Sequence, residues 1–256
     1  MTFMPSSSPS SLVDLLVAIR RGDQPAPAGV DESLVPADMA QAYRVQDAVG
    51  RHMGPIGGWK VGASGPDAEP ACAPIHTGTI FTDGATVPHA LCRYLGVEAE
   101  IGYRFARALP PRDGEWTRDE ILDAIGTIHP VIEILDTRFE KPSSQPALVH
   151  AADQQNHGAL IVGPGRADWR AIVPQTERVI LRIDNDVRVD RIGGNAAGDP
   201  LRMLVWLANH ASRRGIGIGR DVIVTTGSTM GTLFVAHGTD VDVSFAGLGH
   251  VRTHLA

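Results

Sequence analysis

The sequence has too few cysteines to support a disulfide-bonded or zinc-stabilised protein. Its 256 residues include only Cys72 and Cys92, and their spacing does not suit a zinc knot. Small secreted domains usually depend on several disulfides. We therefore predict a cytoplasmic protein with reduced thiols, held together by an ordinary hydrophobic core.

Positive charge and long apolar runs are also scarce. Lys and Arg number 23 against 29 Asp and Glu, which gives a formal net charge of −6. Nucleic acids are bound mainly through clustered Lys and Arg, so a nucleic-acid partner is not expected. No stretch approaches the roughly 20 apolar residues of a membrane span, and MTFMPSSSPSS lacks the pattern of a signal peptide. A small molecule is the expected partner.

The N-terminal part of the chain differs from the rest in composition and in the spacing of its apolar residues. A Ser- and Pro-rich start is typical of a disordered tail. Apolar residues then recur at helical spacing in two segments, the first capped by Ser10 or Ser11 and the second opening at Asp38. We predict an N-terminal tail and helical cap over residues 1–56 and a catalytic, β-rich domain over residues 57–256.

The second part reads as short strands interrupted by a few helices, which indicates an α+β fold. A capping box of Thr117 and Glu120 begins one helix, a second helix is expected over about 147–157, and Asp199 caps a third that stops near Gly215. Strands are predicted over 59–63, 97–105, 131–135, 178–183, 187–191, 222–226, 232–236 and 241–245.

Two local patterns bear on the fold type. The segment VILRIDNDVRVDRI predicts a hairpin that turns near Asn185 and Asp186, which favours antiparallel pairing over a doubly wound parallel sheet. The Gly-rich GGNAAGDP lacks both the GK[ST] ending of a phosphate-binding loop and the spacing of a dinucleotide fingerprint. It is interpreted as the turn before the helix that Asp199 caps.

Three glutamates are candidate metal ligands. In GVEAEIGYRF, Glu98 and Glu100 point to the same face of a predicted strand, about 6–7 Å apart. A solvated polar face is the alternative for this pair alone. Glu133 lies in the apolar run HPVIEILD, where an uncompensated carboxylate would be costly to bury. A third ligand for one cation explains its position.

A hard dication suits this ligand set. Magnesium is favoured, with manganese as its substitute, because oxygen ligands suit hard ions. Zinc is disfavoured because no His or Cys accompanies the carboxylates at ligand spacing, and His129 is interpreted as a packed or capping residue. Lys60 in GGWKVG is the second candidate of interest: burial would lower its pKa into the working range, unless it extends to solvent from a strand edge.

The order and spacing of several motifs resemble one enzyme family. They are AYRVQ, GWKVG, GVEAEIGY, PVIEILDTRF, AADQQNHGALIVG, GDPLRMLVWLAN and DVIVTTGS. They are distributed along nearly the whole chain. Together they resemble the 2-keto-4-pentenoate hydratases and 2-oxo-3-hexenedioate decarboxylases of the fumarylacetoacetate hydrolase-like superfamily. The resemblance implies a mixed β-sandwich roll with a helical N-terminal cap, a homo-oligomer, and magnesium bound by Glu98, Glu100 and Glu133.

The resemblance also assigns roles to further residues. It implies that Lys60 is the acid or base beside the substrate, with Asp83 in GTIFTDG near the rim of the site. Polar positions ahead of HGALIVG and in the TGS turn are implied to bind substrate, although local capping and turn formation explain them equally well. These residues are Asp153, Asn156, Thr226, Gly227 and Ser228. The chain departs from the family between Ser64 and His76, which leaves the substrate open.

The function implied is that of a lyase in aromatic-compound degradation. A metal-dependent hydratase would add water to a 2-hydroxy-2,4-dienoate, with Lys60 and Asp83 moving the proton that converts dienol to enone. The alternatives are a decarboxylase of 2-oxo-3-hexenedioate (4-oxalocrotonate), a hydrolase of a related oxo acid, and a catalytically silent binding protein. A hydrolase would need a water-activating His or acid near the metal, and no such pair is apparent in the sequence.

Overall fold

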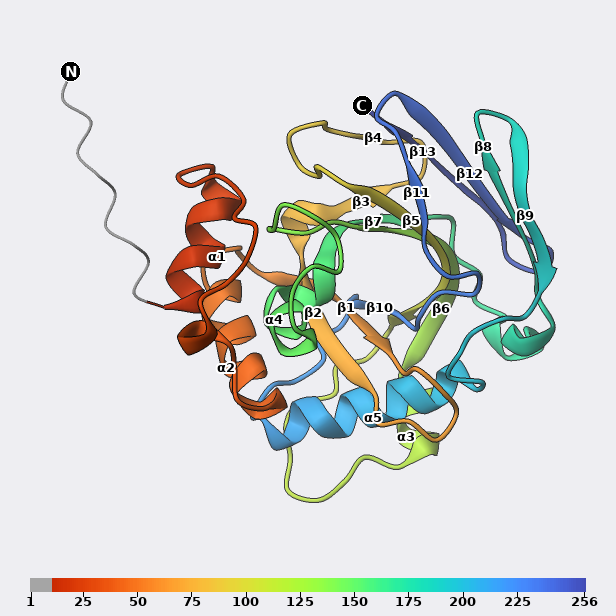
Figure 1. Cartoon of the computed structure of the whole chain (residues 1–256). Coiled ribbons are helices and arrows are strands. Elements are labelled where there is room, and N and C mark those ends of the chain that lie inside the picture. The colour runs from red at the N-terminus through yellow and green to blue at the C-terminus, as the bar shows by residue number, and fades with distance from the viewer. Residues whose placement is uncertain (1–10) are drawn as a thin grey trace.

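The structure is a computed structural model that describes residues 11–256 (Figure 1). The Ser- and Pro-rich tail therefore lies almost entirely outside the described residues. Two β-sheets form the body of the molecule, with helices at one side and along one edge (Figure 1). Among residues 11–256, none of the helices combines the length and apolarity that a bilayer span requires.

The larger sheet carries the candidate site. Its strands lie in the spatial order β2 (Ala71–His76), β1 (Ile56–Gly62), β10 (Ile223–Thr225), β5 (Leu95–Phe105), β6 (Ile125–Leu135), β7 (His157–Val162) and β3 (Ile80–Thr82), and β11 (Leu233–Val235) also pairs with β5. The pairs β1 with β10 and β3 with β7 are parallel, and the others are antiparallel. The sheet is therefore mixed, as expected.

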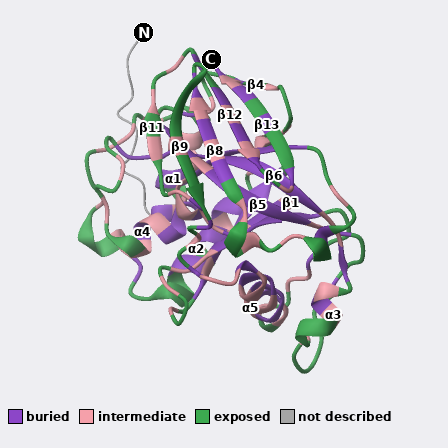
Figure 2. Cartoon of the chain, turned by 90° about the vertical axis from the view of Figure 1, so that its right-hand side faces the viewer, coloured by how far each residue is buried: buried purple, intermediate pink, exposed green. Residues whose placement is uncertain are grey.

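The smaller sheet covers one face of the larger one. Its order is β4 (Thr86–Val87), β13 (Gly249–Leu255), β12 (Thr239–Phe245), β8 (Arg178–Ile183) and β9 (Asp186–Ile192). The predicted hairpin is confirmed as the antiparallel pair β8 and β9. Its turn falls one residue earlier than expected, at Asp184 and Asn185, whose φ values of 51° and 72° suit a type I′ turn. Figure 2 shows β9 as a largely exposed edge and β5 and β6 as buried strands.

The hydrophobic core lies between the two sheets. On β5, Val97, Ala99 and Ile101 face this core, and their partners on β6 include Ile132 and Ile134. The core also contains apolar residues from β8, β12 and β13, which are Val179, Leu181, Val241, Val243 and Val251. Because side chains alternate along a strand, the residues between them on β5 and β6 project to the opposite face of the sheet.

Helix starts agree with the predicted caps. Ser11 caps α1 (Leu12–Arg21), Asp38 caps α2 (Met39–Gly50), Thr117 and Glu120 form the capping box of α3 (Arg118–Leu122), and Asp199 caps α5 (Pro200–Arg213). The helix predicted over 147–157 is too long, because α4 (Ala147–Ala152) ends five residues earlier. Gln154, Gln155 and Asn156 adopt left-handed conformations with φ near 50–60°, which stop the helix. These three residues form η3 (Gln154–Asn156).

The N-terminal helices share a separate hydrophobic cluster with later parts of the chain. Leu15 and Leu16 of α1 and Val49 of α2 pack with Phe139 and Val149. Figure 1 shows α1 and α2 side by side at one flank of the sheets. The cluster therefore crosses residue 56, and the proposed division of the chain there stays a prediction. The remaining short helices are η1 (Glu32–Leu34), η2 (Thr77–Thr79), η4 (Trp169–Ala171) and η5 (Pro174–Thr176).

Candidate metal and substrate site

Three carboxylates meet on the face of the large sheet that points away from the smaller sheet. The strand register places Glu98 directly opposite Glu133, and Glu100 lies two residues further along β5 on the same face. One oxygen from each carboxylate lies within 4.8 Å of the others. Glu100 is 2% exposed and Glu133 is 0% exposed. Like charges directly opposite one another destabilise a sheet, so this arrangement calls for a cation between them.

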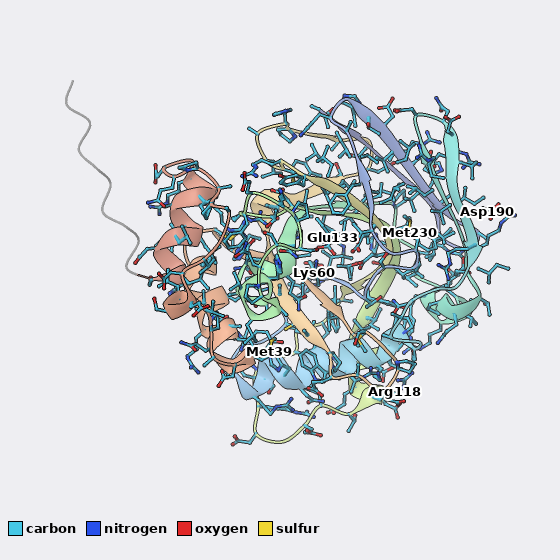
Figure 3. All side chains as sticks on the ribbon, in the orientation of Figure 1. Met39, Lys60, Arg118, Glu133, Asp190 and Met230 are labelled. Atoms are coloured by element: carbon cyan, nitrogen blue, oxygen red, sulfur yellow. The ribbon has the colours of Figure 1, made fainter. Side chains whose placement is uncertain are left out.

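The two oxygens of Glu133 have different surroundings. Its Oε1 lies 2.6 Å from Nζ of Lys60 and 3.0 Å from Nδ1 of His157. Its Oε2 is buried and has no hydrogen-bond partner among the described residues. A buried carboxylate oxygen without a partner is costly, and a metal ion would remove that cost. Figure 3 shows Lys60 and Glu133 meeting in the interior of the molecule.

The other two carboxylates are held by hydroxyl and backbone donors. Thr232 donates a hydrogen bond of 2.5 Å to Oε1 of Glu98. Oε2 of Glu100 accepts hydrogen bonds from the Thr225 hydroxyl and from the Gly227 backbone N–H, the latter 2.9 Å long. Each carboxylate is thus fixed through one oxygen, which preorganises the group for a ligand.

Burial and mutual repulsion shift the pKa values of the carboxylates. Burial, followed by the charge of Glu133, raises the pKa of Glu98 and raises that of Glu100 well above its ordinary value. Burial also opposes ionisation of Glu133, but the charge of Lys60 and the hydrogen bond from His157 lower its pKa overall. Burial and repulsion therefore oppose full ionisation of Glu98 and Glu100, and three ionised carboxylates would carry more negative charge than Lys60 neutralises.

The pKa of Lys60 is shifted in the direction opposite to the one expected from the sequence. Lys60 comes from β1, and its ammonium group contacts Glu133 and donates a 3.1 Å hydrogen bond to the carbonyl of Gln155. Burial does oppose its charge, but the attraction of Glu133 and then Glu98 outweighs burial and raises its pKa. The expectation of a lowered pKa was therefore wrong, because it considered apolar neighbours and not the carboxylates on β5 and β6.

A cavity of about 420 Å³ opens above these groups. Its charged lining consists of Lys60 and four glutamates, the fourth being Glu69 at the rim. The Trp206 indole N–H donates a 2.7 Å hydrogen bond to Glu69. With three converging carboxylates, a buried ammonium and room for a small molecule, the cavity fits a divalent cation together with an anionic ligand.

Known proteins resemble this chain in sequence. A 2-keto-4-pentenoate hydratase from Paraburkholderia xenovorans (strain LB400) is 26% identical over 173 residues, which cover 68% of this chain and 63% of that protein. A 4-oxalocrotonate decarboxylase from Pseudomonas putida is 26% identical over 132 residues, 52% of this chain and 50% of that protein. The chain thus matches less than two thirds of the length of these relatives. No family model matches the sequence.

The fold has a close counterpart among solved structures. A 4-oxalocrotonate decarboxylase from Pseudomonas putida G7, complexed with magnesium and adipate, superposes with a TM-score of 0.81, covering 96% of this chain and 97% of that one at 22% identity. The same enzyme is also known complexed with calcium and acetate. In sequence, the chain is thus similar to 2-keto-4-pentenoate hydratases and 4-oxalocrotonate decarboxylases, and its fold is that of the decarboxylase. The expected α+β fold, with its mixed sheets, is confirmed.

The remaining predicted site residues lie at different distances from the cavity. Gly227 and Ser228 line the cavity, while the Thr226 hydroxyl donates to the Ile101 carbonyl behind it. Asn156 bonds His150 and lines a separate small cavity. Asp83 is exposed at the end of β3, where it accepts the backbone N–H of Arg252. The structure therefore does not bring Asp83 or Asn156 to the candidate metal ligands.

Asp153 lies in a buried ion-pair network. Its carboxylate is 2.7 Å from Arg20 and 2.9 Å from Arg138, and its side chain has no exposed surface. Asp153 is not part of the cavity lining. These contacts join α1 to the loop after β6, so Asp153 acts in this structure as a link between the helical cluster and the large sheet.

Replacing Asp153 with asparagine is expected to lower the free energy of unfolding by about 3–5 kcal/mol, because two buried guanidinium groups lose their shared carboxylate. Urea unfolding measures the change. Asp190→Asn is the matched control: its pair with Arg178 is exposed, so this substitution should change the free energy of unfolding far less. Equal effects of the two substitutions would contradict the structural role of Asp153.

Several residues of the site were missed by the sequence analysis. His157 contacts Glu133, Gln155 binds Lys60 through its carbonyl, and Thr225 and Thr232 donate to the other carboxylates. Asn195, in the Gly-rich GGNAAGDP, donates to the carbonyls of Thr226 and Gly227 and so fixes the TGS turn. The sequence predicted only that this segment forms a turn. The structure adds that the turn holds Thr226 and Gly227 beside the candidate site.

Proposed function

We propose that this protein is a divalent-metal-dependent hydratase that adds water to a 2-hydroxy-2,4-dienoate and yields a 4-hydroxy-2-oxo acid. The proposal is carried by one observation, the convergence of three carboxylates and Lys60 in a single cavity large enough for a small oxo acid. The names of the sequence relatives, which include three hydratases, support it. Magnesium is the proposed metal, with manganese as its substitute.

Glu98, Glu100 and Glu133 are the proposed metal ligands. The orphaned Oε2 of Glu133 and the excess negative charge fit a hard dication. When bound, the ion would stabilise negative charge on the carboxylate and 2-oxygen of an oxo acid. The magnesium in the decarboxylase of similar fold supports this choice of metal.

Lys60 is the proposed group that moves the proton. Its charged Nζ has three N–H bonds. Two of them point to Glu133 and to the Gln155 carbonyl, which leaves the third as a donor for a ligand in the cavity. A charged Lys60 would donate a proton to the terminal carbon of the dienol while the 2-hydroxyl loses its proton to solvent. Once neutral, Lys60 would accept a proton from the water whose oxygen adds at C4, while C3 takes up a proton from solvent. Gly227 and Ser228 form the wall that would orient the substrate. Asp83 takes no part in this proposal.

The charges of the cavity favour a substrate with one carboxylate. Among the described residues that line it, Lys60 is the single cation, and it already pairs with Glu133. A second substrate carboxylate would find no arginine or further lysine there and would meet Glu69 at the rim. An unpaired carboxylate loses solvation without compensation. A hydratase of a monocarboxylate therefore fits better than a decarboxylase of 2-oxo-3-hexenedioate, which remains the alternative because relatives carry that name.

Turnover of two substrates by one preparation tests this choice. With magnesium present, we expect 2-hydroxypenta-2,4-dienoate to be hydrated, with product mass increased by one water. We expect kcat/KM for 2-oxo-3-hexenedioate to be at least about ten-fold lower, because its second carboxylate is unpaired. This ratio corresponds to a loss of roughly 1.4 kcal/mol in transition-state stabilisation. Release of carbon dioxide from the dicarboxylate as the main reaction would favour the decarboxylase instead.

Two further expectations belong with this proposal. A homo-oligomer is proposed from the family resemblance, and light scattering of the purified chain tests it. Cytoplasmic localisation stays a prediction from cysteine content.

A further inference from the structure

A second cavity, of about 360 Å³, lies where the N-terminal helices meet the large sheet. We call it the arginine cavity, because Arg20, Arg21, Arg93 and Arg138 line it. Among the described residues in its lining, Asp136 is the single carboxylate. The arginine cavity is thus opposite in charge to the metal site, in a chain whose net charge is −6.

The charges around the arginine cavity do not balance. Asp153, buried beneath it, pairs with Arg20 and Arg138, and Arg138 also lies 3.5 Å from Asp136. Arg21 and Arg93 have no carboxylate within ion-pair distance among residues 11–256. Four guanidinium groups therefore face two carboxylates, and two positive charges remain to attract an anion.

Arg20 provides an independent indication that the cavity lacks an anion, because one of its donors is unpaired among residues 11–256. Its Nε is buried and has no hydrogen-bond partner among the described residues. Burial, followed by the charge of Arg138, lowers the pKa of Arg20 to about 10. A buried donor without a partner costs free energy that an anion in the cavity would recover.

We propose that the arginine cavity binds a small anion carrying carboxylate or phosphate groups, at a site distinct from the metal centre. Guanidinium groups present paired N–H donors that match both kinds of anion. Two side chains separate the sites, because Thr79 lines the arginine cavity and bonds His157, which in turn bonds Glu133. The anion site does not depend on the proposed function.

Calorimetric titration of the full-length protein with inorganic phosphate, and separately with succinate, tests the proposal. We expect one anion per chain, and the stronger of the two titrations identifies the preferred chemistry. Arg21→Gln and Arg93→Gln, which change exposed arginines without a carboxylate partner among the described residues, should each weaken binding on the order of ten-fold. Arg220→Gln is the matched control, because Arg220 is exposed and lies outside the arginine cavity.

Three outcomes would overturn the proposal. The first is the absence of binding by either anion at concentrations up to tens of millimolar. The second is binding that the two cavity substitutions leave unchanged relative to Arg220→Gln, which would place the anion elsewhere. The third is the loss of subunit association in Arg21→Gln or Arg93→Gln without anion binding, seen by light scattering, which would make the arginine cavity a subunit contact.

Discussion

The substitution Glu133→Ala is expected to abolish hydration and to weaken magnesium binding by more than about 100-fold. Residues that merely support a metal ligand contribute 10- to 100-fold to affinity, so the loss of a ligand should exceed that range. Among residues 11–256, Glu133 also supplies the only carboxylate within ion-pair distance of Lys60. Calorimetry with magnesium and the decay of dienol absorbance measure the two effects.

Folding must be separated from chemistry in this variant, because Glu133→Ala leaves Lys60 buried without its partner. Glu98→Ala provides the second measurement: its carboxylate does not contact Lys60, and it should cause a comparable loss of magnesium binding in a stable protein. Glu115→Ala, which changes an exposed glutamate, is the control and should bind magnesium normally. Tight magnesium binding by both triad variants would refute the proposed ligands.

The elements predicted best were those with a local signal. Caps such as Asp199 and Thr117 depend on side chains that bond the neighbouring backbone, so the sequence alone identifies them. Alternation along β5 likewise predicted that its two glutamates share a face, which the strand register confirms. Five strands were missed, namely β2, β3, β4, β7 and β13. Two of them gave no alternating signal, because every residue of β7 is buried and β2 is nearly so.

The site was harder to predict because its partners come from distant segments. The contact of His157 with Glu133 joins β7 to β6, and nothing in either segment specifies it. The motif around Asp153 indicated a substrate ligand. In the structure its carboxylate forms an ion pair with Arg20, which is more than one hundred residues away in the sequence. Lys60 shows the same limit, since the sign of its pKa shift depends on carboxylates that other strands supply.

Substituting Lys60 with methionine is expected to separate metal binding from catalysis. Turnover should fall by about 10²–10⁴-fold, the usual contribution of a positioned acid or base. Magnesium affinity should stay equal or increase, because the substitution removes a positive charge 2.6 Å from a proposed metal ligand. Parallel calorimetry and steady-state kinetics on the same preparation measure both quantities.

Lys60→Arg makes this test specific to proton transfer. Arginine keeps the positive charge beside Glu133 but does not give up a proton at working pH, so turnover should stay low although the charge is retained. If either variant kept more than about a tenth of the original kcat, Lys60 would be a structural counter-ion to Glu133 and another group would have to move the proton. Loss of magnesium binding in Lys60→Met would instead show that the ammonium group is needed to hold Glu133 in place.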